Sequence, residues 1–91
     1  MGEVRWRAAA LADLKAILDY ISDDDQSAAL ALLDEIDRSA SKLAAHPKRG
    51  RPGRVEGTRE LIVQPTYLIV YAETGRDVAI LRVLHAAQMW P

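Results

Sequence analysis

Three short apolar runs follow one another at the C-terminal end of the chain, and their order constrains the fold more than any other feature. They span residues 59–63, 67–71 and 78–85 and contain many β-branched side chains. Gln64-Pro65-Thr66 separates the first two runs, and a turn around Gly75 separates the last two. Strands with connections this short pair with their neighbours. The sequence therefore predicts a three-stranded antiparallel meander at the end of a small α+β domain.

The half of the chain that precedes the meander has helical periodicity. Residues 3–6 alternate polar and apolar side chains, which is typical of a short strand. Residues 8–22 predict a helix, because five apolar side chains fall in one stripe about 120° wide. Those side chains are Leu11, Leu14, Ile17, Leu18 and Ile21.

A second helix is predicted over residues 26–45, ending at His46-Pro47. The preceding Asp23-Asp24-Asp25 can cap its N-terminus, and so short a connection makes the two helices an antiparallel hairpin. The expected apolar face of this helix consists of Ala29, Leu32, Leu33, Ile36, Ala40 and Leu43.

The central run of the meander is apolar on both pleat faces over residues 68–72, as expected for an interior strand covered on both sides. The helical hairpin can cover one face, and we expect another polypeptide to cover the second. Residues 48–57 contain Pro52 and three glycines and are predicted to form a loop. Residues 1–91 are thus expected to form a single domain with the element order β-α-α-β-β-β.

Composition excludes several classes of protein. The 91 residues support one modest core. The absence of cysteine excludes disulfides and cysteine-ligated metals, and it fits a cytoplasmic protein. No apolar run is long enough to span a membrane. His46 and His85 lack carboxylate clusters at ligand spacing, and no phosphate-binding glycine motif is present, so we predict neither a metal nor a cofactor.

The formal net charge of −1 hides an asymmetry. Residues 1–47 carry five Lys/Arg against nine Asp/Glu, whereas residues 48–91 carry seven against four. This polarity could orient the domain on a charged partner, or it could be chance unevenness in a small domain.

The strongest local charge cluster is the loop that begins at Lys48. Guanidinium groups suit oxyanions and glycines permit close approach, although a solvated surface loop is the alternative. No aromatic residue is interleaved, so base stacking is unsupported, and an acidic protein surface would suit the cluster as readily as a nucleic acid. The candidate target-binding residues here are Arg49, Arg51, Arg54 and Arg59.

Arg82 and His85 near the end of the last run could act together on a phosphodiester, since a histidine pKa lies near neutral pH. In a regular strand, however, their odd spacing places them on opposite faces, and a structural role for His85 at the strand end is the alternative. Both remain candidate target-binding residues. Trp90 is another, as an interface anchor or as a lid on the core.

The helical hairpin offers a candidate groove for a partner segment. Leu30 and Tyr20 fall about 60° outside the apolar stripes of their helices, which leaves them available for contacts outside the core. The candidate partner-binding residues are Leu14, Leu18, Tyr20, Leu30 and Leu33.

These features resemble toxins of the RelE/ParE superfamily from bacterial type II toxin–antitoxin modules. The resemblance covers nearly the whole chain. It rests on the first strand, the helical hairpin and the basic loop, together with Arg59-Glu60-Leu61, Tyr67-Leu68-Ile69-Val70-Tyr71, Ile80-Leu81-Arg82-Val83-Leu84-His85 and Trp90-Pro91.

The resemblance implies one of two activities. Members of the RelE-like branch are ribosome-dependent mRNA endonucleases, and in that case Arg59, Arg82 and His85 would be the catalytic residues. That branch has basic residues or tyrosine where this chain has Leu68, Ala86-Ala87 and Trp90, so the expected branch is ParE-like, which blocks DNA gyrase by binding. A degenerate, non-toxic antitoxin-binding protein is a further alternative.

The resemblance also implies partners. We expect a ParD-like antitoxin of the ribbon-helix-helix type, whose disordered C-terminal segment folds onto the toxin to give a toxin–antitoxin hetero-oligomer. The antitoxin would supply the DNA-binding part, so this chain itself is not expected to bind DNA sequence-specifically.

Overall fold

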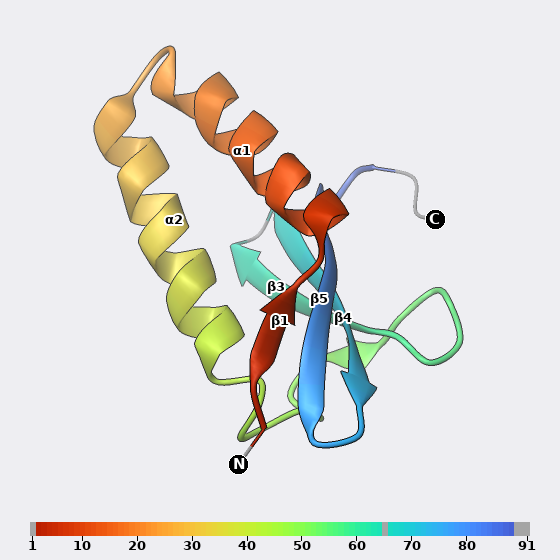
Figure 1. Ribbon diagram of the computed structural model, residues 1–91. Helices are drawn as coiled ribbons and strands as arrows, with labels where there is room; N and C mark the ends of the chain where they lie inside the picture. The colour runs from red at the N-terminus through yellow and green to blue at the C-terminus, as the bar shows by residue number, and fades with distance from the viewer. Residues whose placement is uncertain (1, 65, 89–91) are drawn as a thin grey trace.

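A helical hairpin lies along one side of a five-stranded sheet in the computed structural model, which describes residues 2–64 and 66–88 (Figure 1). The predicted α+β class is confirmed. The elements in chain order are β1 (Val4–Trp6), α1 (Ala8–Ser22), α2 (Gln26–Ser41), β2 (Arg51–Pro52), β3 (Arg59–Gln64), β4 (Tyr67–Thr74) and β5 (Asp77–His85).

The sheet has the strand order β1-β5-β4-β3-β2. Strands β3, β4 and β5 pair antiparallel, so the predicted meander is confirmed. β1 pairs parallel with β5, with Val4 opposite Val78 and Trp6 opposite Ile80. The first and last strands of the chain are therefore neighbours, and β5 lies in the interior of the sheet along that part of its length.

The segment predicted to be a loop contains one short strand. In β2, Arg51 pairs with Glu60 and Pro52 with Arg59. The prediction of an unbroken loop over residues 48–57 was wrong here. Proline has no N–H to donate, and it is tolerated because β2 is an edge strand. This pairing fixes one end of the basic loop against β3.

The core lies between the helices and one face of the sheet. On the helices it comprises Ala10, Leu32, Ile36, Ala40 and Leu43, and on the sheet Val63, Ile69, Tyr71, Val78, Ile80 and Val83. Leu14, Ile17 and Ile21 pack partly buried against it.

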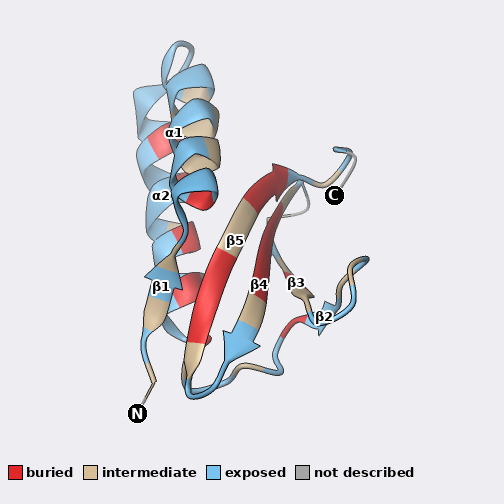
Figure 2. Cartoon of the chain, turned by 45° about the vertical axis from the view of Figure 1, so that its right-hand side comes forward, coloured by how far each residue is buried: buried red, intermediate tan, exposed pale blue. Residues whose placement is uncertain are grey.

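Not every side chain of the predicted apolar faces reaches this core, and Leu11, Leu18 and Leu33 do not belong to it. Leu11 is 52% exposed and Leu33 is 36% exposed. The predicted stripe was too wide, because only its central part meets the sheet. Leu11 and Leu33 lie towards one edge of their stripes, on the outer flank of the hairpin, where Figure 2 shows extensive exposed surface.

The second face of the sheet is also buried over β4 and β5, although another polypeptide was expected to cover it, whereas Ile62 on β3, opposite Leu68, is 52% exposed. Leu68, Val70, Ala79 and Leu84 alternate with the core-facing residues of their strands and are at most 2% exposed. The chain itself covers this face. Arg54 Nη1, from the loop after β2, donates to the backbone oxygen of Gln88 after β5, at 3.2 Å.

Strands β3 and β4 lie between these two segments, so the contact between Arg54 and Gln88 crosses over the face of the sheet. Figures 1 and 2 show both segments on the side away from the helices. The expectation of an open second face was wrong because sequence periodicity does not show where loops fold back.

A side-chain cap marks the start of α2 but not that of α1. The Asp25 side chain accepts a hydrogen bond from the Ala28 amide at 3.1 Å, as expected for the N-cap of α2. α2 ends at Ser41, four residues before the predicted end, and the chain continues in turns to Ala45. Among the described residues, no helix is long and apolar enough to cross a membrane.

Candidate functional site

The basic loop, defined here as residues 48–58, is held at its start by a buried tyrosine. Tyr71 on β4 is fully buried, and its hydroxyl donates to the Pro47 carbonyl at 2.7 Å. The same oxygen accepts from the Gly50 amide at 2.8 Å. A buried hydroxyl without partners would cost about 1–3 kcal/mol, so these two bonds tie the loop to the sheet.

Glycine is required at the point where the loop crosses the sheet. A Cβ on Gly50 would lie 2.7 Å from the Tyr71 hydroxyl oxygen and 2.9 Å from the Glu60 carbonyl oxygen. Contacts this short force the neighbouring atoms apart. The backbone of the loop can therefore approach β3 and β4 only without a side chain at this position.

A buried carboxylate holds the middle of the loop. Glu60 on β3 is 2% exposed. Its Oε1 accepts from Arg51 Nη2 at 3.2 Å, and its Oε2 accepts from the Arg54 amide at 3.1 Å and lies 3.7 Å from Arg54 Nε. A buried carboxylate needs such partners, because desolvation would otherwise disfavour its charge. Two of the four candidate arginines in and beside the loop thus share one counter-ion.

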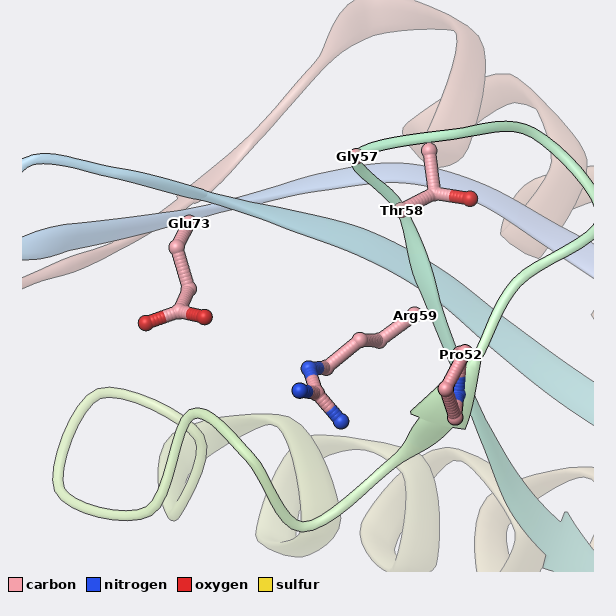
Figure 3. Close-up of a pocket in the computed structure, with 5 residues that line it drawn as sticks. All are labelled: Pro52, Gly57, Thr58, Arg59 and Glu73. Carbon is pink, nitrogen blue, oxygen red and sulfur yellow. The ribbon is translucent and has the colours of Figure 1, made fainter.

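Arg59 lines a separate pocket of about 360 Å³ beside the loop (Figure 3). Its Nη1 donates to the Gly50 carbonyl at 2.7 Å. Glu73 lines the same pocket and pairs with Lys48 at 3.2 Å. In the described part of the chain, the Arg49 side chain makes no ion pair, and the residue is exposed. Arg49 and Arg59 are therefore the two candidate arginines without a carboxylate partner in this part of the chain.

Arg82 is engaged by α1. Its Nε and Nη2 donate to the two carboxylate oxygens of Asp13 at 2.6 and 2.9 Å, and the Val83 amide donates to Asp13 at 3.0 Å. The hydrogen bond that Arg82 donates to Asp13 raises the pKa of the Arg82 guanidinium. Asp13 thus joins helix to sheet just beyond the end of β1, and Arg82 is a structural partner of α1.

His85 ends β5 on the other face of the sheet. The register is unbroken from Arg82, opposite Val70, to His85, opposite Tyr67, so the two side chains point in opposite directions. The His85 ring packs edge-on against Tyr67 with centroids 5.6 Å apart, and its Nδ1 accepts from the Ala87 amide at 3.2 Å. The structure does not bring Arg82 and His85 together. Trp90 lies outside the described residues.

The groove on the outer side of the hairpin is shallow and apolar with an acidic margin. It is defined here by Leu18 on α1 and Leu30 and Leu33 on α2. Leu30 is 60% exposed, and Asp34 and Asp37 line an adjoining hollow with it. Three of the five candidate partner-binding residues are therefore contiguous.

The other two candidate partner-binding residues lie elsewhere. Leu14 packs against the core. Tyr20 is 78% exposed, but at 100° per residue it points about 160° away from Leu18 around α1. Leu11, which was not selected, is exposed and lies one heptad before Leu18 on the same flank. Its position at the edge of the apolar stripe was the signal that could have identified it.

Sequence reasoning also missed the acidic and phenolic groups that position the arginines. Glu60, Tyr71 and Asp13 were not candidates. A single carboxylate within the apolar β3 pattern, as at Glu60, was the available signal. In the described ranges, no group of three or more histidine, aspartate or glutamate residues could hold a metal ion.

Comparison with known proteins identifies the family. Residues 4–90 match the family described as the ParE toxin of the type II toxin–antitoxin system parDE. The chain is 42% identical to Y4kP of Sinorhizobium fredii over 88 residues, which is 97% of this chain and 92% of Y4kP. It is 40% identical to Toxin RelE2 of Caulobacter vibrioides over 89 residues, which is 98% of this chain and all of that protein.

The fold agrees with these matches. A solved structure of the chromosomal ParDE toxin–antitoxin system from P. aeruginosa has a chain 29% identical in sequence, with a TM-score of 0.81. The match covers 93% of this chain and 96% of that one. The protein belongs to the ParE toxin family of type II toxin–antitoxin systems, within the RelE/ParE superfamily.

Proposed function

We propose that this ParE-family toxin inhibits DNA gyrase by binding it and performs no chemistry of its own. The observation that carries the proposal is the separation of Arg82 from His85. Cleavage of a phosphodiester needs an acid–base group and a charge-stabilising group around one phosphate. Here the candidate groups lie on opposite faces of the sheet, and Arg82 is bound to Asp13.

Arg59 does not complete such a site. Its guanidinium is bonded to the Gly50 carbonyl and lies at the β2–β3 end of the sheet, whereas His85 ends β5. The register supports this separation, since Arg59 is opposite Tyr71 and His85 is opposite Tyr67, four residues away on β4. At about 3.4 Å per residue, the two positions are more than 13 Å apart along the strand direction. This geometry favours a binding protein over a ribonuclease.

We further propose that a cognate ParD-like antitoxin neutralises the toxin through the helical groove. The groove exposes Leu18, Leu30 and Leu33 beside Asp34 and Asp37. An amphipathic antitoxin helix with basic flanks would match both the apolar strip and its acidic margin. The second sheet face, where the chain already buries β4 and β5 and leaves Ile62 exposed, offers less apolar area for such a segment.

Two parallel assays test the proposed target. Purified toxin should inhibit supercoiling by purified gyrase and leave ribosome-bound mRNA intact. Cleavage of mRNA with unaffected supercoiling would refute gyrase inhibition and favour the RelE-like activity. Growth without arrest and inactivity in both assays would favour a non-toxic, antitoxin-binding protein.

A separate experiment tests the antitoxin surface. Leu30→Asp should weaken capture by the antitoxin encoded beside the toxin gene, because it places a charge in the apolar strip. Ala31→Asp, one position further along the exposed side of α2, serves as the matched control. Equal capture of both variants and the wild type would refute the assignment of the groove.

A further inference from the structure

The arrangement of Arg51 and Arg54 around Glu60 has a use beyond holding the loop. We propose that Glu60 is a positioning residue that presents these two guanidinium groups as a fixed pair to an acidic protein surface on gyrase. The inference rests on the gyrase inhibition proposed above. It assigns the contact with the target to a defined part of the basic loop.

Both guanidinium groups keep donors available for a partner. The side chains of Arg51 and Arg54 are 55% and 41% exposed, although each contacts the buried Glu60. A guanidinium has five N–H donors, and Arg51 uses only its Nη2 on Glu60. Because both side chains are partly exposed, donors not used on Glu60 or Gln88 are available to form paired hydrogen bonds with a carboxylate.

The shared counter-ion places the two arginines in advance of binding. A long side chain loses rotamer entropy when an interface immobilises it. Glu60 and the Gln88 carbonyl already restrict Arg54, and Glu60 restricts Arg51. Much of that entropy is therefore lost on folding, before the target is met.

Stability alone does not account for a charge at this position. Replacing a buried ion pair by apolar side chains of similar volume is often neutral or stabilising. The Tyr71 hydroxyl already ties the start of the loop to the sheet, and β2 pairs with β3 through its backbone. A carboxylate at Glu60 is needed where two cations must be held close together without repelling each other.

The charges of the loop favour a protein partner over a nucleic acid. Lys48 pairs with Glu73, Arg51 and Arg54 pair with Glu60, and Glu56 lies within the loop itself. Binding to a phosphate backbone depends on uncompensated cations that release counter-ions. Within the described residues, Arg49 is the one cation of the basic loop without an ion pair, so most of the charge of the loop is compensated and suits a few directed contacts with carboxylates instead.

Direct binding measurements test the proposal. Wild-type toxin is titrated into purified gyrase, first without DNA and then with DNA. The variant Glu60→Gln and the double variant Arg51→Ala/Arg54→Ala are measured in the same two titrations. The control variant is Arg76→Ala, which removes one cation from the exposed turn between β4 and β5. Thermal unfolding of every variant reports whether the fold is kept.

The expected results distinguish positioning from support of the fold. Glu60→Gln keeps the shape but removes the counter-ion, so affinity for DNA-free gyrase should fall about tenfold. The double variant should bind at least as weakly, and Arg76→Ala should stay within about twofold of wild type. Adding Glu60→Gln to the double variant should cause no further loss, because its effect acts through the two arginines.

Each other outcome overturns a defined part of the reasoning. A wild-type toxin that neither binds nor inhibits gyrase refutes the proposed function, and this inference with it. A wild-type toxin that inhibits gyrase while the double variant binds equally well refutes the inference alone. Loss of affinity in the double variant but not in Glu60→Gln removes the positioning role. Effects seen only when DNA is present identify a nucleic-acid contact instead. The double variant leaves the buried Glu60 carboxylate without its cations, so the triple variant that also carries Glu60→Gln, which removes this charge as well, tests the surface if either parent variant fails to fold.

Discussion

Replacing Asp13 with alanine should destabilise the protein far more than an ordinary change on a helix surface. The carboxylate receives two hydrogen bonds from the Arg82 guanidinium and one from the Val83 amide. The Asp13 side chain is 17% exposed and that of Arg82 is 36% exposed. The substitution leaves a half-buried cation and a strand amide without their acceptor.

The expected loss follows from these contacts. Removing one partner of a fully buried ion pair costs about 3–5 kcal/mol. Water can reach Arg82 and recover part of that energy, so we expect a loss of about 2–3 kcal/mol in the free energy of unfolding. For a domain of this size, that corresponds to a fall in Tm of roughly 10–20 °C.

Thermal and urea unfolding of Asp13→Ala and Asp19→Ala provide the measurement. Asp19 lies on the same helix and forms an exposed pair with Lys15, so its removal should change the stability far less than removal of Asp13. Asp13→Asn keeps an acceptor oxygen for one of the donors and should fall between the two. Equal stability of the Asp13→Ala and Asp19→Ala variants would refute the account of Asp13 as the link between α1 and β5.

Two further predictions concern the loop and the pH dependence of stability. Tyr71→Phe removes the hydroxyl that ties the basic loop to β4, so it should lower the free energy of unfolding by about 2 kcal/mol. The same variant should speed tryptic cleavage of the basic loop, and an unchanged cleavage rate would contradict this prediction. The hydrogen bond from the Glu3 amide, and next that from Arg5, lowers the pKa of the Asp77 carboxyl below its ordinary value of about 3.9. The contribution of Asp77 to stability should therefore be present above that value and be lost as the pH falls through the lower, folded-state pKa. Acid unfolding of Asp77→Asn should be less steep over that range, and parallel curves for variant and wild type would count against the assignment.

The sequence predicted the fold well because its signals were local. Alternating and helical periodicities located the antiparallel strands and both helices, and Asp25 capped α2 as expected. The errors arose where distant contacts decide the structure. Periodicity gives no sign that the Arg54 loop and the Gln88 segment meet over the second sheet face, nor that residues 51–52 pair with β3.

The candidate site was harder to predict for the same reason. The arginines were visible as a cluster, but their partners come from positions that look like parts of regular elements. Asp13 resembles any polar residue on a helix, and only the folded chain brings it to Arg82, 69 residues later. By contrast, strand alternation alone predicts that the side chains of Arg82 and His85 point to opposite faces of the sheet. The unbroken register of β5 against β4 confirms this prediction.

The parallel pairing of β1 with β5 has a consequence for the biogenesis of the toxin. Strand β1 gains its hydrogen-bonding partner only once β5 has been translated, because Val78 and the residues after it supply the hydrogen bonds along β1. Contacts so distant in sequence form late and slowly during folding. A nascent chain in which β5 has not yet been synthesised therefore cannot assemble this sheet.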